Sequence, residues 1–119
     1  MKTILLVDDS TSIRNIIKGS LIQEYQVVEA VDGQDALNQL DKGVVPDLVL
    51  LDVNMPVMDG LTLLGVLKGD ARWKTKPVLM LTTETKAERR QEAKDLGAVG
   101  WILKPCDPGQ LLTALKTIL

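Results

Sequence analysis

Two runs of apolar residues in this 119-residue chain are each followed directly by carboxylates. Residues 4–7, Ile-Leu-Leu-Val, precede Asp8 and Asp9, and residues 48–51, Leu-Val-Leu-Leu, precede Asp52. Four apolar residues in succession are typical of a strand covered on both faces, and such strands belong to parallel sheets flanked by helices. Ligands bind beyond the carboxyl ends of the strands in open α/β sheets. The two runs therefore predict an α/β fold with three acids at its ligand-binding edge.

The rest of the chain alternates apolar runs with helical patterns, without a repeat or a low-complexity linker. Five such units predict a doubly wound, five-stranded parallel sheet in the flavodoxin-like strand order 2-1-3-4-5, with five helices on both faces. The predicted strands are residues 3–7, 26–30, 47–51, 77–82 and 100–103. The predicted helical stripes are Ile13, Ile16, Ile17 and Leu21 after a Ser10 cap; Ala36, Leu37 and Leu40; Leu61, Leu64 and Leu67; a thin stripe within 86–96; and Leu111, Leu112, Leu115 and Ile118 after Asp107 and Pro108.

In this strand order the first and third strands are neighbours, so Asp8, Asp9 and Asp52 should lie together. Three clustered carboxylates repel one another unless a cation lies between them. A ligand set made only of oxygens favours magnesium, calcium or manganese over zinc. The chain has no histidine and one cysteine, which excludes His-ligated metal, Ser-His or Cys-His catalysis and a phosphohistidine on this chain.

Two further strand ends carry polar groups that suit the same edge. The fourth predicted strand ends at Thr82, and Lys104 follows the fifth. An ammonium and a hydroxyl beside three acids can bind an oxyanion that is bridged to a metal. The set suits phosphoryl chemistry, in which an Asp carboxylate can act as the nucleophile.

Length and composition indicate one soluble domain spanning 1–119. The chain is 45% hydrophobic and 25% charged, with a net charge of -2, which argues against a nucleic-acid surface. No apolar run reaches the roughly 20 residues needed to span a bilayer, and the first strand begins too early to leave room for a signal peptide. The single cysteine, Cys106, fits a reducing compartment, so a cytoplasmic location is expected.

Over its whole length the chain resembles a receiver domain of the two-component response-regulator family, of the single-domain CheY type. The residues that carry the resemblance follow predicted strands, in order. They are Asp8-Asp9, Asp52, the segment Asn54-Met55-Pro56-Val57-Met58-Asp59-Gly60, Thr82-Thr83 and Lys104-Pro105.

The resemblance implies that Asp52 is the phosphoacceptor and that a phosphohistidine on a partner histidine kinase is the donor. It implies Mg²⁺ bound by Asp9, Asp52 and the backbone carbonyl of Asn54, with Asp8 acting through metal-bound water, although Mn²⁺ would satisfy the same ligands. Lys104 and Thr82 would hold the phosphoryl oxygens. A cis Lys104–Pro105 bond is also implied.

The resemblance further implies a switch rather than an enzyme. Thr82 would move toward the phosphoryl group and Trp101 would turn inward, although Trp stands here where Tyr or Phe is commoner. Its larger ring would be harder to accommodate in a close-packed core. The output face would join the helix within 86–96, the fifth strand and the last helix. Without an attached output domain, a monomeric chain would signal by binding another protein. Asn54 and Glu84 resemble residues that tune dephosphorylation in chemotaxis-type regulators, which points to the flagellar motor switch.

Other interpretations remain open on the sequence. The chain could serve a phosphorelay outside chemotaxis, or be a metal-dependent phosphohydrolase with an aspartyl nucleophile, although such enzymes carry Asp-x-Asp after their first strand. A flavodoxin-like cofactor binder would need a phosphate loop where Asp8 and Asp9 stand. Asp9 alone could be a helix cap. Asp59-Gly60 is first a turn signal, in which Gly60 needs only a permissive backbone.

Overall fold

The five apolar segments form one parallel sheet in the order β2-β1-β3-β4-β5, in a computed structural model that describes all 119 residues. This order confirms the predicted fold class. Three strands have the predicted bounds, whereas the third and fourth begin one residue later than predicted, at Leu48 and Val78. Asp47 still contacts β1, because its N–H donates to the Thr3 carbonyl and its carboxylate accepts the Thr3 N–H, both at 2.7 Å. The strands are β1 (Thr3–Val7), β2 (Gln26–Ala30), β3 (Leu48–Leu51), β4 (Val78–Thr82) and β5 (Gly100–Leu103).

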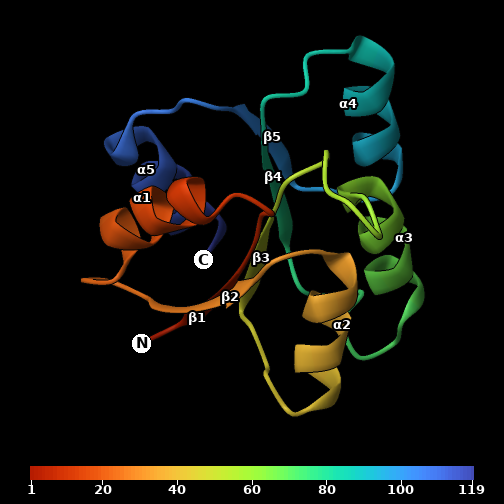
Figure 1. The fold of residues 1–119 in the computed structure, drawn as a ribbon, viewed down its shortest axis with the longest axis horizontal. Coiled ribbons are helices and arrows are strands. Elements are labelled where there is room, and N and C mark those ends of the chain that lie inside the picture. The colour runs from red at the N-terminus through yellow and green to blue at the C-terminus, as the bar shows by residue number, and fades with distance from the viewer.

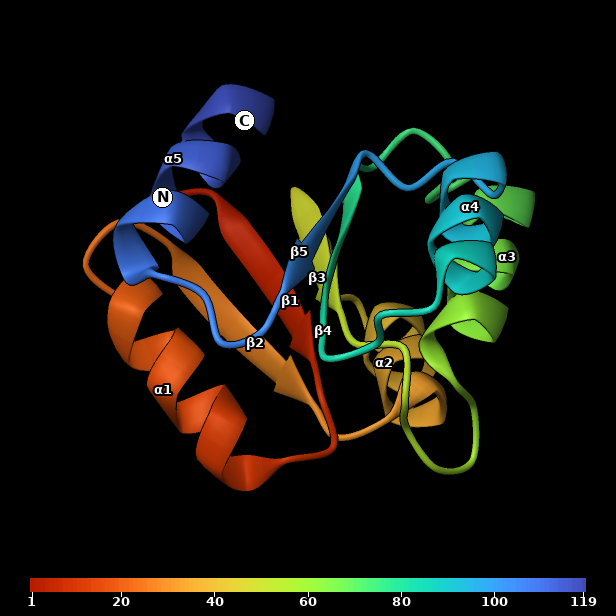
Figure 2. The same ribbon diagram turned by 90° about the horizontal axis from the view of Figure 1, so that it is seen from above.

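Helices cover both faces of the sheet, as the doubly wound topology requires. Seen from above in Figure 2, α1 and α5 lie on one side of the strands, and α2, α3 and α4 lie on the other. Figure 1 shows the same two groups from the side. None of the helices is both long enough and apolar enough to pass through a bilayer. The helices are α1 (Thr11–Leu21), α2 (Gly33–Asp41), α3 (Gly60–Gly69), α4 (Ala87–Asp95) and α5 (Pro108–Ile118).

The two central strands supply both halves of the core. Successive side chains of a strand point to opposite faces, so β1 and β3 send alternate residues to each layer. Leu5 and Leu51 join a cluster of 17 buried residues under α2, α3 and α4. Ile4 and Leu50 join a cluster of 11 buried residues under α1 and α5. The continuous apolar runs are thus explained by burial on both faces.

Most helices begin at a polar cap that accepts a backbone N–H. Ser10 and Asp107 cap α1 and α5 as predicted, and Pro108 is the first residue of α5. Because Ser10 is the cap of α1, the reading of Asp9 as a helix cap is wrong. Helix α4 differs, since Lys86 stands at its cap position without a side-chain hydrogen bond and Ala93 is its only buried residue. The thin apolar stripe predicted for this helix is confirmed.

The predicted stripe of α1 contains one error. Ile16 is 66% exposed, whereas Arg14 is 8% exposed. The buried residues Arg14, Ile17 and Leu21 are spaced three and four residues apart, as expected for one face of a helix. The inward face of α1 therefore has the predicted period but includes a charged residue in place of Ile16. A pattern built on apolar residues alone could not include Arg14.

Candidate functional site

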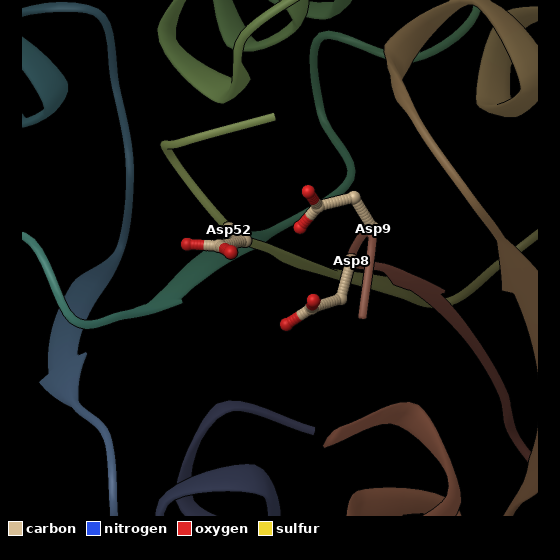
Figure 3. Close-up of side chains that lie close together, drawn as sticks. All are labelled: Asp8, Asp9 and Asp52. Atoms are coloured by element: carbon tan, nitrogen blue, oxygen red, sulfur yellow. The ribbon is translucent and has the colours of Figure 1, made fainter. Parts of the chain in front are cut away.

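Three carboxylates meet beyond the carboxyl ends of β1 and β3. Val7 of β1 is paired in register with Leu51 of β3, so Asp8 and Asp52 leave the sheet side by side. One oxygen of Asp8, of Asp9 and of Asp52 lies within 4.8 Å of the others. Figure 3 shows the three side chains gathered at this point, with Asp9 directed toward Asp52. Asp8 and Asp52 are buried, whereas Asp9 is exposed.

Lys104 brings one positive charge to the three acids. Its Nζ lies 2.6 Å from Oδ2 of Asp8 and 3.4 Å from Oδ2 of Asp52, and its side chain is nearly buried. Its backbone N–H donates to the carbonyl of Thr82 at 2.9 Å. This bond extends the pairing of β4 with β5 and fixes the backbone position of Lys104. One ammonium among three carboxylates leaves two negative charges without a partner.

The remaining contacts of the carboxylates leave room for a cation. Oδ1 of Asp8 accepts the Ser10 N–H at 2.9 Å, and Oδ1 of Asp52 accepts the Val53 N–H at 2.8 Å. The exposed Asp9 carboxylate takes part in no hydrogen bond or ion pair of the structure. Hard oxygens with an excess negative charge and an open side toward water fit a divalent ion that retains several waters, as Mg²⁺ does. The donor set therefore fits the implied metal.

Asn54 and Glu84 connect the loops after β3 and β4. Nδ2 of Asn54 donates to Oε2 of Glu84 at 3.1 Å, and Oε1 of Glu84 accepts the Lys86 N–H at 3.2 Å. The hydrogen bond from Asn54, then that from the Lys86 backbone, hold the pKa of the Glu84 carboxyl below its ordinary value. The two residues singled out in the sequence are thus in direct contact at the rim of the site. The metal-ligand role of the Asn54 carbonyl stays a prediction.

Thr82 lies at the end of β4 and is fully buried. Its Oγ1 accepts the Glu84 N–H at 3.2 Å and makes no hydrogen bond to the acids or to Lys104. The structure thus brings Asp8, Asp9, Asp52 and Lys104 together and holds the Thr82 hydroxyl against its own loop.

Gly60 has a structural role that the sequence did not reveal. A Cβ at this position would lie 1.9 Å from the carbonyl oxygen of Asp52, and the Gly60 N–H donates to the Val53 carbonyl at 2.8 Å. The start of α3 therefore packs directly on the backbone that carries Asp52, which only glycine permits. Asp59 is the cap of α3, so the interpretation of Asp59-Gly60 as chiefly a turn is wrong. No spacing rule signals this contact, because it depends on how the loop returns to β3.

The structure has two hollows, and none of the three acids lines either of them. The larger, about 470 Å³, lies between α4 and β5 and is lined in part by Trp101. The smaller, about 120 Å³, lies between α1 and the segment after β5 and is lined in part by Lys104 and Cys106. Burial raises the pKa of the half-buried Cys106 thiol. The Lys104–Pro105 bond is cis, as expected.

Comparison with known proteins defines the class to which this fold and site belong. Residues 4–116 match the model of the response regulator receiver domain. The chain belongs to the response regulator receiver domain family.

Its relatives include chemotaxis proteins. The chain is 41% identical to the chemotaxis protein CheY-3 of Vibrio cholerae over 117 residues, which cover 97% of this chain and 89% of that protein. It is 36% identical to the chemotaxis protein CheY1 of Helicobacter pylori, with 98% of this chain and 95% of that protein covered. The solved structure of Vibrio cholerae CheY4 matches with a TM-score of 0.92 and 42% identity, over 100% of this chain and 99% of that one.

Proposed function

We propose that this protein is a phosphorylation-dependent signalling switch in which Asp52 accepts a phosphoryl group from a phosphohistidine of a partner kinase. The observation that carries the proposal is the position of Lys104, whose Nζ lies against both Asp8 and Asp52 while Asp9 stands open beside them. The arrangement offers a nucleophilic carboxylate, a cation-binding pair of acids and a fixed positive charge within one cluster.

Each residue of the cluster has a role that follows from its contacts. An oxygen of Asp52 attacks the phosphorus atom as the bond to the histidine nitrogen breaks, so the phosphoryl group is transferred without net hydrolysis. Asp9 and Asp52, with the Asn54 carbonyl and with Asp8 acting through water, would hold Mg²⁺, which supplies charge neutralisation for the phosphoryl oxygens. Lys104 exchanges its contact with Asp52 for one with a phosphoryl oxygen.

The response to phosphorylation would pass through Thr82 and Trp101. Thr82 Oγ1 would give up its bond with the Glu84 N–H and donate to a phosphoryl oxygen, which moves the loop after β4. Trp101 lies on β5, next to β4, and is half-buried beside the hollow of about 470 Å³. The hollow provides space beside the larger ring that a close-packed receiver core would lack. The surface of α4, β5 and α5 is the proposed binding face for the target protein.

The openness of the acid cluster supports a switch over an enzyme that turns over small substrates. Neither hollow surrounds the three acids, so the phosphoryl donor is best delivered by a protein surface. The relatives named as chemotaxis proteins support a place in chemotaxis, with a flagellar motor switch as the target. A phosphorelay outside chemotaxis is the alternative, and the two differ in which protein the phosphorylated form binds.

Intact mass after incubation with acetyl phosphate tests the proposal. With Mg²⁺ and rapid quenching, the wild type should gain one phosphoryl group, and it should gain none when Mg²⁺ is chelated. Asp52→Asn should gain none under either condition while keeping its fold. Equal labelling of this variant and the wild type would show that Asp52 is not the acceptor. No labelling of the wild type, together with no binding of beryllofluoride, would contradict the proposed chemistry.

A further inference from the structure

Arg14 is a buried charge that the proposed phosphoryl transfer does not use. It lies on α1 with its side chain only 10% exposed, although arginine is rarely buried unless it is paired. Burying a guanidinium costs free energy that must be offset by its contacts. The position of those contacts therefore shows what the residue holds in place.

The guanidinium of Arg14 donates a hydrogen bond to the backbone of the acid pair Asp8-Asp9. Nη1 donates to the carbonyl oxygen of Asp8 at 2.6 Å, and Nη2 donates to Oγ1 of Thr11 at 3.3 Å. Nε lies 3.3 Å from Oε1 of Glu29 but lacks the alignment of a hydrogen bond, so this contact is an ion pair only. The carbonyl of Asp8 belongs to the peptide bond that joins Asp8 to Asp9. Arg14 thus connects β2 and α1 to the peptide between the two acids.

Fixing this peptide fixes the directions of both carboxylates. The Asp8 side chain is already held by Lys104 and by the Ser10 N–H, whereas that of Asp9 has no partner of its own. A small rotation of the Asp8–Asp9 peptide would carry the Asp9 carboxylate away from Asp52. Partners behind metal ligands set the orientation of those ligands and strongly affect affinity.

We propose that Arg14 is a positioning residue for the divalent-cation site, holding the Asp8–Asp9 peptide so that Asp9 faces Asp52. This proposal rests on the proposed function, because it assumes that the acids bind a cation. A positioning role and a merely structural ion pair predict opposite changes in cation affinity when Arg14 is replaced. Removing a positive charge beside three acids should strengthen cation binding by Coulomb attraction alone. Loss of positioning should weaken it.

Lys18 supplies a matched control on the same helix. Its Nζ lies 3.3 Å from Oε2 of Glu29, the carboxylate that also faces Arg14, but it does not contact Asp8. Lys18→Met and Arg14→Met therefore remove the same charge and leave Glu29 with one cationic partner. Only Arg14→Met frees the Asp8 carbonyl.

The experiment is a titration of each variant with Mn²⁺, following the electron paramagnetic resonance signal of the free ion. Arg14→Met should bind Mn²⁺ about tenfold more weakly than the wild type. Lys18→Met should bind it as tightly as the wild type or more so. Arg14→Lys keeps the charge but loses the planar guanidinium with its several N–H donors, and its Mn²⁺ affinity should lie between those of the wild type and Arg14→Met. Circular dichroism and urea unfolding check that each variant is folded.

Affinity of Arg14→Met within twofold of that of Lys18→Met, or tighter than the wild type, would overturn the proposal. If Arg14→Met does not fold, Arg14→Lys decides: weakening of threefold or more supports positioning, and wild-type affinity overturns it. A wild-type protein that binds no Mn²⁺ and takes no phosphoryl group would instead contradict the proposed function. The two failures are therefore distinguishable.

Discussion

Val57, in the loop between Asp52 and α3, adopts a backbone conformation that suits glycine. Its φ is +68°, and it is the only non-glycine residue with a positive φ. The Met58 N–H donates to the Pro56 carbonyl at 2.7 Å, which closes a tight three-residue turn around Val57. Such a turn is rare, and a β-branched side chain makes it less favourable. The side chain is 82% exposed, so burial does not offset the strain.

Val57→Gly should therefore stabilise the protein. Relief of the positive φ should outweigh the greater entropy that glycine gives to the unfolded chain, for a net gain of about 1 kcal/mol. Val45 is the control, because it is also an exposed loop valine but has no positive φ. Val45→Gly should lose about 0.5–1 kcal/mol. Urea unfolding of both variants measures the difference, and a parallel loss in both would show that Val57 is not strained.

Gly60→Ala tests the close contact between α3 and the backbone of Asp52. The added methyl group would stand 1.9 Å from the Asp52 carbonyl oxygen, which cannot move without displacing the acceptor. We expect a loss of about 3 kcal/mol in the free energy of unfolding and weaker phosphorylation by acetyl phosphate. Gly65, in the middle of the same helix, has nothing within 4 Å of its added Cβ. Gly65→Ala should stabilise the protein by about 0.5–1 kcal/mol, and similar effects at both positions would contradict the contact.

The residues of the cluster differ in how far sequence could locate them. Asp8, Asp52 and Lys104 were predictable as a group because each follows an apolar strand, and parallel strands end at one edge. Arg14 and Gly60 were not predictable in the same way. The importance of Arg14 comes from a backbone carbonyl that its side chain reaches, and that of Gly60 from the path of a returning loop. Neither property is expressed in residue type or spacing.

At the scale of elements, Asp59 joins α3 to α4. Its Oδ1 accepts the Thr62 N–H at 2.8 Å as the cap of α3, and its Oδ2 lies 3.6 Å from Nη2 of Arg89 on α4. Partial burial by itself would raise the pKa of the Asp59 carboxyl. The hydrogen bonds from Thr62 and the charge of Arg89 together outweigh this effect and hold the pKa below its ordinary value. The helix with the fewest buried residues, α4, is thus attached to the helix that packs on Asp52.

The lowered pKa of Asp59 makes part of the stability depend on pH. A carboxyl whose pKa is lower in the folded than in the unfolded state contributes stability that is fully present above the unfolded pKa, near 4. That contribution is lost as pH falls through the folded pKa. Asp59→Asn keeps a capping oxygen but removes the charge. Its stability should therefore fall short of that of the wild type at pH 7, and the shortfall should shrink as pH falls below the unfolded pKa.

Urea unfolding between pH 7 and pH 3 measures this difference. Asp59→Ala is the second comparison, because it loses the cap itself and should be about 1 kcal/mol less stable at pH 7. At low pH Asp59→Ala should still be less stable than the wild type and Asp59→Asn, because both of those proteins keep a side-chain oxygen that can cap α3. A gap between wild type and Asp59→Asn that does not change with pH would contradict the linkage.

The elements themselves were largely predictable. Strands β1, β2 and β5 have the expected bounds. The predicted bounds of β3 and β4 were one residue too long at the start, although the Asp47 N–H donates to the Thr3 carbonyl and the Pro77 carbonyl accepts the Val49 N–H. The exposure of Ile16 was missed because the inward face of α1 is completed by Arg14. Periodicity identified the elements, and specific side-chain contacts decided their details.

At the scale of the whole molecule, charge and packing oppose each other at one edge of the sheet. Strands β1 and β3 are central in the sheet and buried on both faces, so Asp8 and Asp52 are held rigidly at their ends. Nothing in the sheet allows the acids to separate and relieve their repulsion. The repulsion lowers the stability of the folded chain relative to the unfolded chain, in which the acids are far apart. A divalent cation should reverse this effect.

Mg²⁺ should therefore stabilise the folded protein, and each tenfold rise in free Mg²⁺ above the dissociation constant should add about 1.4 kcal/mol to the free energy of unfolding. Asp9→Asn should be more stable than the wild type without metal, because it removes one repelling charge, and should gain much less from Mg²⁺. Thermal unfolding at constant ionic strength, with K⁺ replacing Mg²⁺, separates binding from screening. Equal stabilisation of wild type and Asp9→Asn by Mg²⁺ would place the cation elsewhere, since Asp9 is the acid of the cluster that has no other partner.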